Sequence, residues 1–367
     1  MKQTNKKVGF VTFHRANNLG AALQASALCK FINENISPCE IIDFVPNNSC
    51  GSNYMQKLPL LRNLKNAILS LKDELSRNKA AKFASFRREE MCISKRTYYG
   101  DNEMLKASNK YNVLISGSDQ ILNSTLSGNS KSYYLAFDEQ AKKISYASSF
   151  GRDNISENEI SLIKSELSKF DDLSVREASA SSLIKSYIGK ESTLVVDPVF
   201  LLNRKDWEIV QSNELKTPNK YIFVYSMEVS KTLENIVKNM HDETNLPVIV
   251  VRGGGKSGLI IGTEDCNCGP KEFLRYISNA EYIITNSFHG TAMSLIFGKK
   301  FISVSHSSRN ARLSNIFDMI NSSDKLVPFE GTSKNVDEYI IDGANSYTLL
   351  KKTIDFSKDF LTKSINK

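Results

Sequence analysis

The stretch VGFVTFHRANNLGAALQASALCKFINENISPCEIIDFV, residues 8–45, decides the fold. It opens with a short apolar run at residues 8–13. Ala, Leu, Phe and Ile then recur at helical spacing over residues 20–33, and a second apolar run follows at residues 40–45. Apolar runs joined by an amphipathic segment are typical of a strand–helix–strand unit on a parallel sheet. We therefore expect an α/β fold.

The same alternation continues along the chain in two series, separated by a polar stretch at residues 203–219. The first series predicts strands at 111–116, 143–148, 172–175 and 192–196, and helices at 157–169 and 177–187. The second predicts strands at 221–225, 247–251, 282–285 and 301–304, and helices at 230–243, 270–279, 291–297 and 309–320. We expect two Rossmann-like domains facing a cleft, residues 1–203 and 204–346, and a C-terminal helix within 347–367 that packs back on the first domain.

A helical insertion is expected at about residues 55–95, because residues 58–91 have a long helical pattern rich in Lys and Arg. A basic amphipathic helix can lie on an anionic membrane or guide an anionic substrate. It can equally present a solvated basic face, and the sequence leaves both interpretations open.

The composition narrows the class of protein. Among 367 residues, 41% are hydrophobic and 24% charged, which is ordinary for globular domains. The 48 Lys and Arg exceed the 40 Asp and Glu, giving a net charge of +8 that favours anionic partners such as phosphates or sugar acids. A Lys-rich solvated surface also accounts for this excess. No basic stripe interleaved with aromatic residues is present, so we expect no nucleic acid partner.

Targeting and metal-binding signals are weak. No apolar stretch of signal-peptide type follows the basic N-terminus, and no apolar run approaches the length of a membrane span. We expect a cytoplasmic protein, with peripheral contact at the inner face of the membrane through residues 58–91 as an option. The six cysteines are scattered, and Cys266 and Cys268 lack the further ligands of a closed metal site. We expect neither metal nor cofactor, and the oligomeric state stays open.

The segment after the first strand is a candidate anion site. Gly20 opens a helix soon after the strand, where free backbone N–H groups and the helix dipole favour negative charge. The pattern is not G-x-G-x-x-G, so it does not imply a dinucleotide. His14 and Arg15 can reach the cleft, although Arg15 also suits a surface turn. The candidate binding residues here are His14, Arg15, Asn18, Gly20 and Gln24.

Two further strand ends in the first half carry polar residues. Ser118, Asp119 and Gln120 follow residues 111–116, where they suit sugar hydroxyls and Asp119 can act as a base. Ser118 or Asp119 can instead cap the next helix. Arg176 ends the strand at 172–175, where it can bind a carboxylate or phosphate in bidentate fashion, or form a structural pair with Glu177.

The second half has its sharpest signal at residues 283–292, IITNSFHGTA. Asn286 or Ser287 can cap the helix that follows this strand, and His289 then lies in the first turn, beside Gly290. A histidine there can bind an anion or transfer a proton. Arg309 and Arg312 are three residues apart after the next strand and, near His306, form a second cationic edge. Gly253, Gly254 and Gly255 follow another strand, but flexible loops look the same.

Taken together, these segments resemble the polysaccharide pyruvyl transferases. The blocks occur in the family's order and span roughly residues 8–320: NLGAALQ at 18–24, GSDQ at 117–120, SYASSFG at 145–151, SVRE at 174–177, DP at 197–198 and TNSFHGT at 285–291. The resemblance implies a GT-B-like fold and transfer of a pyruvyl group from phosphoenolpyruvate to two hydroxyls of a sugar of a cell-surface polysaccharide. The products are a cyclic ketal and phosphate, and the acceptor is a glycan or lipid-linked sugar.

The resemblance also implies roles for single residues. The Arg of the S-V-R block maps to Arg176, and the His of the H-G block maps to His289; relatives use such residues to bind phosphoenolpyruvate. We assign Arg176 to the donor's carboxylate or phosphate, His289 to proton transfer or phosphate binding, and Asp119 to a base or hydroxyl ligand. Many relatives have R-L-H-G where this chain has Ser287 in place of the Arg.

That departure keeps two other functions open. One is a GT-B glycosyltransferase that uses a nucleotide sugar, with Gly20 or residues 253–255 cradling its diphosphate. The other is a non-catalytic sugar- or anion-binding protein of polysaccharide assembly.

Overall fold

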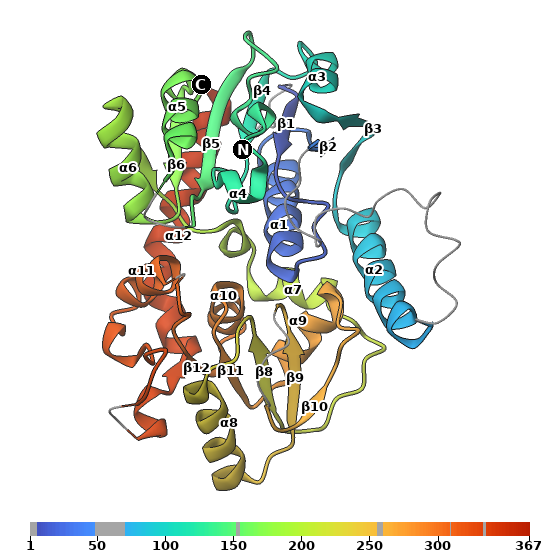
Figure 1. The fold of residues 1–367 in the computed structure, drawn as a ribbon, viewed down its shortest axis with the longest axis vertical. Helices are drawn as coiled ribbons and strands as arrows, with labels where there is room; N and C mark the ends of the chain where they lie inside the picture. The colour runs from blue at the N-terminus through green and yellow to red at the C-terminus, as the bar shows by residue number, and fades with distance from the viewer. Residues whose placement is uncertain (1–5, 48–69, 152–154, 255–259, 309, 333–334) are drawn as a thin grey trace. The chain divides into compact units, whose positions relative to one another are not determined.

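A computed structural model describes residues 6–47, 70–151, 155–254, 260–308, 310–332 and 335–367 (Figure 1). By contacts the chain divides into two units, and each is described by itself. Unit 1 comprises residues 1–67, 84–202 and 353–367, and unit 2 comprises residues 68–83 and 203–352. Two helices, α2 (Ser70–Glu90) and α12 (Gly343–Asn366), contribute residues to both units.

Unit 1 is built on a parallel sheet with the strand order β3-β2-β1-β4-β5-β6-β7. Strands such as β1 and β4 are buried along their whole length, as expected for a parallel sheet covered by helices. Its elements are β1 (Val8–Val11), α1 (Leu19–Asn35), β2 (Cys39–Val45), β3 (Ile93–Tyr99), α3 (Gly100–Met104), β4 (Val113–Ser116), α4 (Ser124–Ser127), β5 (Lys142–Ser148), α5 (Glu157–Ser165), β6 (Asp172–Val175), α6 (Ala178–Ile188), β7 (Thr193–Leu194) and the short helix η5 (Pro198–Leu201).

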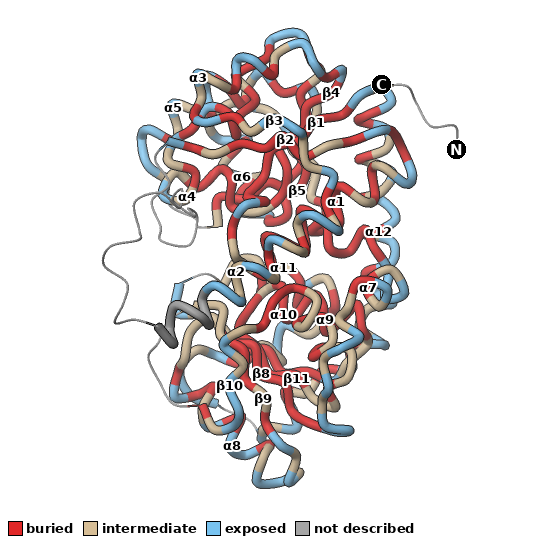
Figure 2. Tube along the Cα trace, turned by 90° about the vertical axis from the view of Figure 1, so that its right-hand side faces the viewer, coloured by how far each residue is buried: buried red, intermediate tan, exposed pale blue. Residues whose placement is uncertain are grey.

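Unit 2 repeats this plan with the strand order β10-β9-β8-β11-β12-β13, in which the pair β12–β13 is antiparallel and the other pairs are parallel. Figure 2 shows the strands of both sheets predominantly in red, the colour of buried residues. The elements are α7 (Arg204–Val210), β8 (Ile222–Ser226), α8 (Lys231–Thr244), β9 (Val248–Arg252), β10 (Thr263–Glu264), α9 (Pro270–Asn279), β11 (Tyr282–Thr285), α10 (Phe288–Ile296), β12 (Lys300–Ser303), α11 (Ala311–Met319) and β13 (Ile341–Asp342).

The α/β class with two Rossmann-like units is confirmed, because each sheet reverses its strand order once at its centre. The division of the chain into domains at residues 203 and 346 stays a prediction. At the C-terminus of α12, the Lys6 Nζ donates to the carbonyl of Ile365 at 3.0 Å, and the backbone N–H of Val196 donates to Ser357 Oγ at 3.0 Å. Both contacts lie within unit 1.

Two elements differ from the prediction. In the described part of the helical insertion expected at about residues 55–95, helix α2 occupies Ser70–Glu90, but strand β3, which was not predicted, begins at Ile93 and forms the edge of the sheet; residues 55–69 lie outside the described part. The charged Lys95 and Arg96 conceal this strand, because their side chains are exposed at the edge. Helix α10 begins at Phe288, three residues before the start that apolar periodicity indicates, whereas the prediction of Ser287 as its cap and His289 in its first turn agrees with the structure.

Candidate functional site

Both sheets place polar segments at the point where their strand order reverses. In unit 1 this point lies between β1 and β4, which are followed by residues 12–18 and 117–120. In unit 2 it lies between β8 and β11, followed by residues 227–230 and 286–290. Ligands of open α/β sheets bind outside the carboxyl ends of the strands at such points. The two segments of each unit are therefore the first place to look for a site.

Arg176, directly after β6, is the centre of a buried ionic network in unit 1. Its guanidinium lies 3.3 Å from Asp119 Oδ1 and 3.7 Å from Glu177 Oε2, and it donates a short hydrogen bond to Asp197 Oδ2. The side chain of Arg176 is 1% exposed. Burial alone would lower the pKa of Arg176, but the charges of Asp197, Asp119 and Glu177 outweigh it and raise that pKa above its usual value. Arg176 is therefore a permanent buried cation.

Four separate sequence segments meet in this network. Ser118 donates to Asp197 Oδ2 at 3.3 Å, and Ser149 donates to Glu177 Oε1. Asp197 also caps η5 by accepting from the N–H of Val199 at 3.1 Å. The loops after β4, β5 and β6 and the start of η5 are thereby tied to one guanidinium. This enclosure by carboxylates favours the structural interpretation of Arg176 over a direct anion contact.

Asp119 is the member of the network that reaches solvent. Its side chain is 14% exposed, and its backbone has φ +78°, a left-handed conformation that is strained for most residues. The Oδ1 atom accepts from the N–H of Gln120 at 2.9 Å and from Arg176, whereas Oδ2 has no hydrogen-bond partner within the described residues. The network thus fixes one carboxylate oxygen and leaves the other open.

Ser118 and Gln120, both expected to bind sugar, are engaged internally. Gln120 packs against Gly151, whose φ is +68° and where an added Cβ would lie 2.2 Å from the Gln120 amide oxygen. The same oxygen accepts from Asn123 Nδ2 at 3.3 Å. The alternative that Ser118 or Asp119 caps the next helix is wrong, because Asn123 caps α4.

His14 and Arg15 form a second cluster around Asp43 of β2. Arg15 donates from Nε and Nη2 to the two Asp43 oxygens at 2.6 Å each, and Thr97 of β3 donates to Oδ2 at 2.6 Å. The buried His14 contacts Asp43 Oδ1 at 2.9 Å and the Thr12 carbonyl at 3.1 Å. Burial raises the pKa of Asp43, but the hydrogen bonds from His14, Arg15 and Thr97 outweigh it and hold that pKa well below its usual range.

Arg87 of α2 lies beside this cluster. It donates to the side chain of Asn17 at 3.1 Å and has no ion-pair partner in the part of the chain that the structure describes. Burial and the neighbouring charge of Arg15 lower the pKa of Arg87. Two arginines thus lie close together near the start of α1, which is an arrangement suited to an anion.

The other predicted residues of this segment support α1. Asn18 caps the helix by accepting from the N–H of Ala21 at 3.0 Å, and Gly20 lies in its first turn. Gln24 is fully buried and donates to Thr12 Oγ1 at 2.8 Å and to the Ala21 carbonyl at 3.1 Å. Asn18 and Gln24 therefore shape the loop after β1.

In unit 2, Asn286 joins the loops after β8 and β11. Its Oδ1 accepts from the N–H of Met227 at 2.7 Å, and its Nδ2 donates to the Glu228 carbonyl. Ser287 is the N-cap residue of α10, but its side chain makes no capping hydrogen bond. His289 is buried in the first turn, with its ring edge against Phe288 at a centroid distance of 5.2 Å. Gly290 packs directly against Thr285 of β11, because an added Cβ would lie 2.3 Å from Thr285 Oγ1.

The residues predicted to form a second cationic edge lie in the loop after β12 and at the start of α11. His306 Nε2 lies 2.8 Å from Glu228 Oε2, and the guanidinium of Arg312 lies 5.8 Å from the centre of the Phe288 ring. Arg309 lies outside the described residues. Gly253 packs against Met227 and Tyr225, so its lack of a side chain is explained by packing. Arg312 and His289 therefore flank the same phenylalanine at the start of α10.

Asp43, Thr97, Arg87 and Glu228 belong to these clusters and were not predicted as site residues. Asp43 had a signal, since a carboxylate inside the apolar run EIIDFV needs a partner. The other three had none, because their partners are far away in the sequence. No group of three metal-ligating side chains occurs among the described residues, where Cys266 is exposed and Cys268 is buried as free thiols. Within the same residues, no helix is both long and apolar enough to cross a bilayer.

The comparison with protein families decides the identity. A family model described as polysaccharide pyruvyl transferase matches residues 18–308. The chain belongs to the polysaccharide pyruvyl transferase family. The matched region contains all six sequence blocks of the predicted resemblance. In this pyruvyl transferase family member, the Arg176 network and helix α10 both lie within that region. No curated protein matches the sequence.

Solved structures similar to this pyruvyl transferase family member have low sequence identity. A structure of S. aureus MnaA with UDP is 13% identical, covers 98% of this chain and 91% of its own, and has a TM-score of 0.47. The UDP-GlcNAc 2-epimerase of Methanocaldococcus jannaschii with UDP-GlcNAc and UDP is 12% identical. That match covers 97% of this chain and 93% of the epimerase chain, with a TM-score of 0.47. The glycosyltransferase SnogD of Streptomyces nogalater is 9% identical. That match covers 98% of this chain and 100% of the SnogD chain, with a TM-score of 0.43.

Proposed function

We propose that this protein transfers the pyruvyl group of phosphoenolpyruvate to two hydroxyls of a glycan or lipid-linked sugar, forming a cyclic ketal of a cell-surface polysaccharide. Family membership supports the transferase class. The structural observation that supports the chemistry best is Asp119, held through Oδ1 by Arg176 and open at Oδ2. We place the reaction in the cytoplasm, with peripheral membrane contact when the acceptor is lipid-linked.

The chemistry defines what the side chains must do. Protonation of the methylene carbon of phosphoenolpyruvate gives a cationic centre at the neighbouring carbon, and a sugar hydroxyl attacks this centre while losing its proton. Phosphate then leaves with the C–O bonding pair and takes up one proton as hydrogen phosphate, and the second hydroxyl closes the ring and releases its proton. The enzyme must therefore bind two anionic groups, accept two protons from the hydroxyls, and deliver one to the methylene carbon and one to the leaving phosphate.

We assign the proton acceptor to Asp119, with Arg176 as its positioning residue. This assignment replaces the direct donor contact first expected for Arg176, because three carboxylates already surround that guanidinium. The open Oδ2 can accept a hydroxyl proton, and the fixed Oδ1 keeps the carboxylate in one orientation.

Binding of the donor's anionic groups is assigned to His289, Arg312 and the first turn of α10 in unit 2. Ser287 occupies the position of the frequent family Arg, and Arg312 supplies a cation at the same helix start. In unit 1, Arg15, Arg87 and the start of α1 offer a second anion-binding segment, beside Asn18 and Gly20. Polar residues of the strand ends, among them Ser118, Gln120, Gln24, His14 and Asn286, shape these loops.

A comparison of surface polysaccharide tests the function directly. Cells from which the gene is deleted are expected to lose the ketal methyl signal from the proton spectrum of purified polysaccharide, and the wild-type gene restores it. An unchanged methyl signal in the deletion strain would contradict the proposed reaction.

A ligand titration separates the proposed donor from the alternatives. Phosphoenolpyruvate is expected to raise the melting temperature in a concentration-dependent way, because a ligand that binds only the native state stabilises it. A rise with uridine or guanosine diphosphate sugars and none with phosphoenolpyruvate would favour a glycosyltransferase. Binding of the acceptor without phosphate release would favour a sugar-binding protein.

A further inference from the structure

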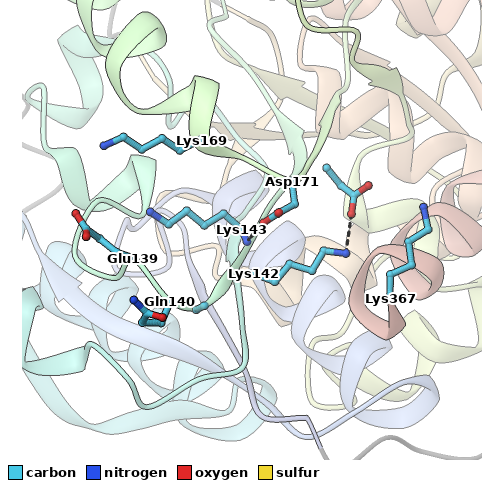
Figure 3. A pocket seen from close by; sticks show the side chains of 9 residues that line it. Glu139, Gln140, Lys142, Lys143, Lys169, Asp171 and Lys367 are labelled. Carbon is cyan, nitrogen blue, oxygen red and sulfur yellow. Dashed lines mark hydrogen bonds and ion pairs between the residues drawn. The ribbon is translucent and has the colours of Figure 1, made fainter.

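A cavity of about 850 Å³ opens in unit 1 at the amino ends of β5 and β6 (Figure 3). It is lined by residues 139–143, 169, 171, 172 and 367. Strand β5 runs from Lys142 to Ser148, so the cavity lies about 20 Å from the carboxyl ends at which Asp119 and Arg176 lie. The proposed catalytic residues therefore do not account for it.

Lys143 is the central cation of this cavity. The residue is only 4% exposed, and Figure 3 shows its side chain extending along the cavity toward the side of Lys169 and Glu139. Its backbone N–H donates to Asp171 Oδ2 at 2.8 Å, which fixes the position of the residue. Within the described residues, the Lys143 Nζ has no hydrogen-bond or ion-pair partner.

The neighbouring lysines are different, because each already has an acceptor. Lys142 Nζ lies 2.9 Å from Asp172 Oδ2 and donates to the Ser364 carbonyl at 2.7 Å. Lys169 Nζ lies 2.8 Å from Glu166 Oε2, with its side chain half-exposed. Burial, and then the charge of Lys169, lower the pKa of Lys143. The charges of Glu166, Asp138 and Glu139 act in the opposite direction but do not outweigh these two effects. The Lys143 ammonium has therefore lost water without gaining a direct ion-pair partner among the described residues.

The rest of the lining suits a polar molecule that is larger than a bare anion. Glu139 and Gln140 offer carboxylate and amide groups at the end of the cavity near Lys143 (Figure 3). These groups can accept and donate hydrogen bonds to hydroxyls. A volume of about 850 Å³ lies within the usual range for small-molecule sites and exceeds that of a single phosphate.

We propose that this cavity binds a small anionic carbohydrate, with its phosphate or carboxylate group on Lys143 Nζ and its hydroxyls on Glu139 and Gln140. The anion supplies the direct ion-pair partner that the buried ammonium lacks within the described residues. Lys169, which is half-exposed and paired with Glu166, lies at the same end and can turn toward the anion. The site is distinct from the proposed active site and does not depend on the proposed function.

Calorimetric titration of the full chain with glucose 1-phosphate tests this site. The wild type is expected to bind it and not to bind glucose. Lys143→Met removes the charge and keeps the bulk, and is expected to weaken binding at least tenfold. Lys164→Met, on the exposed face of α5, is the control and is expected to bind as the wild type. Binding of equal strength in Lys143→Met and wild type, or no binding in the wild type, would overturn the proposal.

Two further variants complete the test. Lys169→Met changes a half-exposed side chain, so we expect this variant to fold. It is expected to weaken binding about threefold, which keeps the proposal testable if Lys143→Met does not fold. His289→Ala is expected to keep the Lys143-dependent binding in full. Loss of binding in His289→Ala would assign the ligand to the proposed donor site and refute a second site.

Discussion

At the scale of single residues, Arg176 shows why a strand-end arginine can be misjudged. Its position after a buried strand suits an anion ligand, but the structure surrounds its guanidinium with Asp119, Glu177 and Asp197. Sequence analysis predicted both an anion contact and a structural pair with Glu177. It could not choose between them, because Asp119 and Asp197 lie 57 and 21 residues away.

Removal of the Arg176 charge should therefore destabilise the protein strongly. Arg176→Met leaves the buried Asp197 and Glu177 and the partly exposed Asp119 without their counter-ion, and loss of one partner of a buried ion pair costs about 3–5 kcal/mol. We expect a correspondingly lower urea midpoint. Arg204→Met is the matched control, since Arg204 forms a half-exposed pair with Glu208 that is worth about 0–1 kcal/mol. Equal urea midpoints for the two variants would show that the Arg176 network does not stabilise the fold more than an exposed ion pair does.

Asp43 gives a pH-dependent prediction. Its folded-state pKa is depressed, so its contribution to stability is fully present above its unfolded pKa of about 3.9 and declines as the pH falls below that value. Asp43→Asn should be less stable than wild type at pH 7, and the difference between the two melting temperatures should shrink below about pH 4. If the difference in melting temperature stays constant from pH 7 to pH 3, the hydrogen bonds from His14, Arg15 and Thr97 do not stabilise the ionised Asp43 as described.

At the scale of elements, the sequence predicts helices and strands that are defined by their own apolar pattern. It misses those that are defined by contacts with residues far away in the sequence. The strand at 172–175 and the helix at 270–279 agree with β6 and α9, because apolar periodicity and breakers mark both ends. Strand β3 was missed, since its pairing with β2 is a long-range property of an exposed, charged edge. Apolar periodicity placed the start of α10 at residue 291, but the strand-end interpretation with Ser287 as cap and His289 in the first turn agrees with the observed start at Phe288.

The start of α10 can be tested through Gly290. Gly290→Ala places a Cβ 2.3 Å from Thr285 Oγ1, so the helix must move away from β11. We expect a loss of about 1–3 kcal/mol, as for overpacked cores, together with weaker phosphoenolpyruvate binding. Gly331→Ala is the control, because nothing lies within 4 Å of its Cβ and only the backbone strain of φ +75° is added. A Gly290→Ala variant no less stable than Gly331→Ala would contradict the packing argument.

Helix α2 shows that a basic segment is not always a free surface. In the described part of this helix, Lys82 pairs with Glu272 of α9 at 3.1 Å and Arg87 donates to Asn17. Both side chains therefore make contacts within the protein, whereas the sequence pattern left open a helix that faces a membrane, guides an anionic substrate or presents a solvated basic face. Arg87 lies beside Asn17 and Arg15, in the segment near α1 that we propose to bind an anion.

At the scale of the whole molecule, two copies of one topology carry different polar groups at the same topological position. Unit 1 has a carboxylate held by a buried arginine, and unit 2 has a histidine and an arginine at a helix start. The doubled Rossmann-like pattern was predictable from the alternation of apolar runs. The pairing of Asp119 with Arg176 and of Asn286 with Glu228 was not, because the sequence does not show which strand ends are neighbours.

The central claim is that Asp119, held by Arg176, accepts protons from the sugar hydroxyls. Phosphate release from phosphoenolpyruvate, measured with polysaccharide from the deletion strain as acceptor, tests it most directly. Asp119→Asn is expected to lower kcat at least about 100-fold, the usual contribution of a positioned base, while the melting-temperature rise with phosphoenolpyruvate stays unchanged. Turnover of Asp119→Asn within twofold of the wild type would contradict the account.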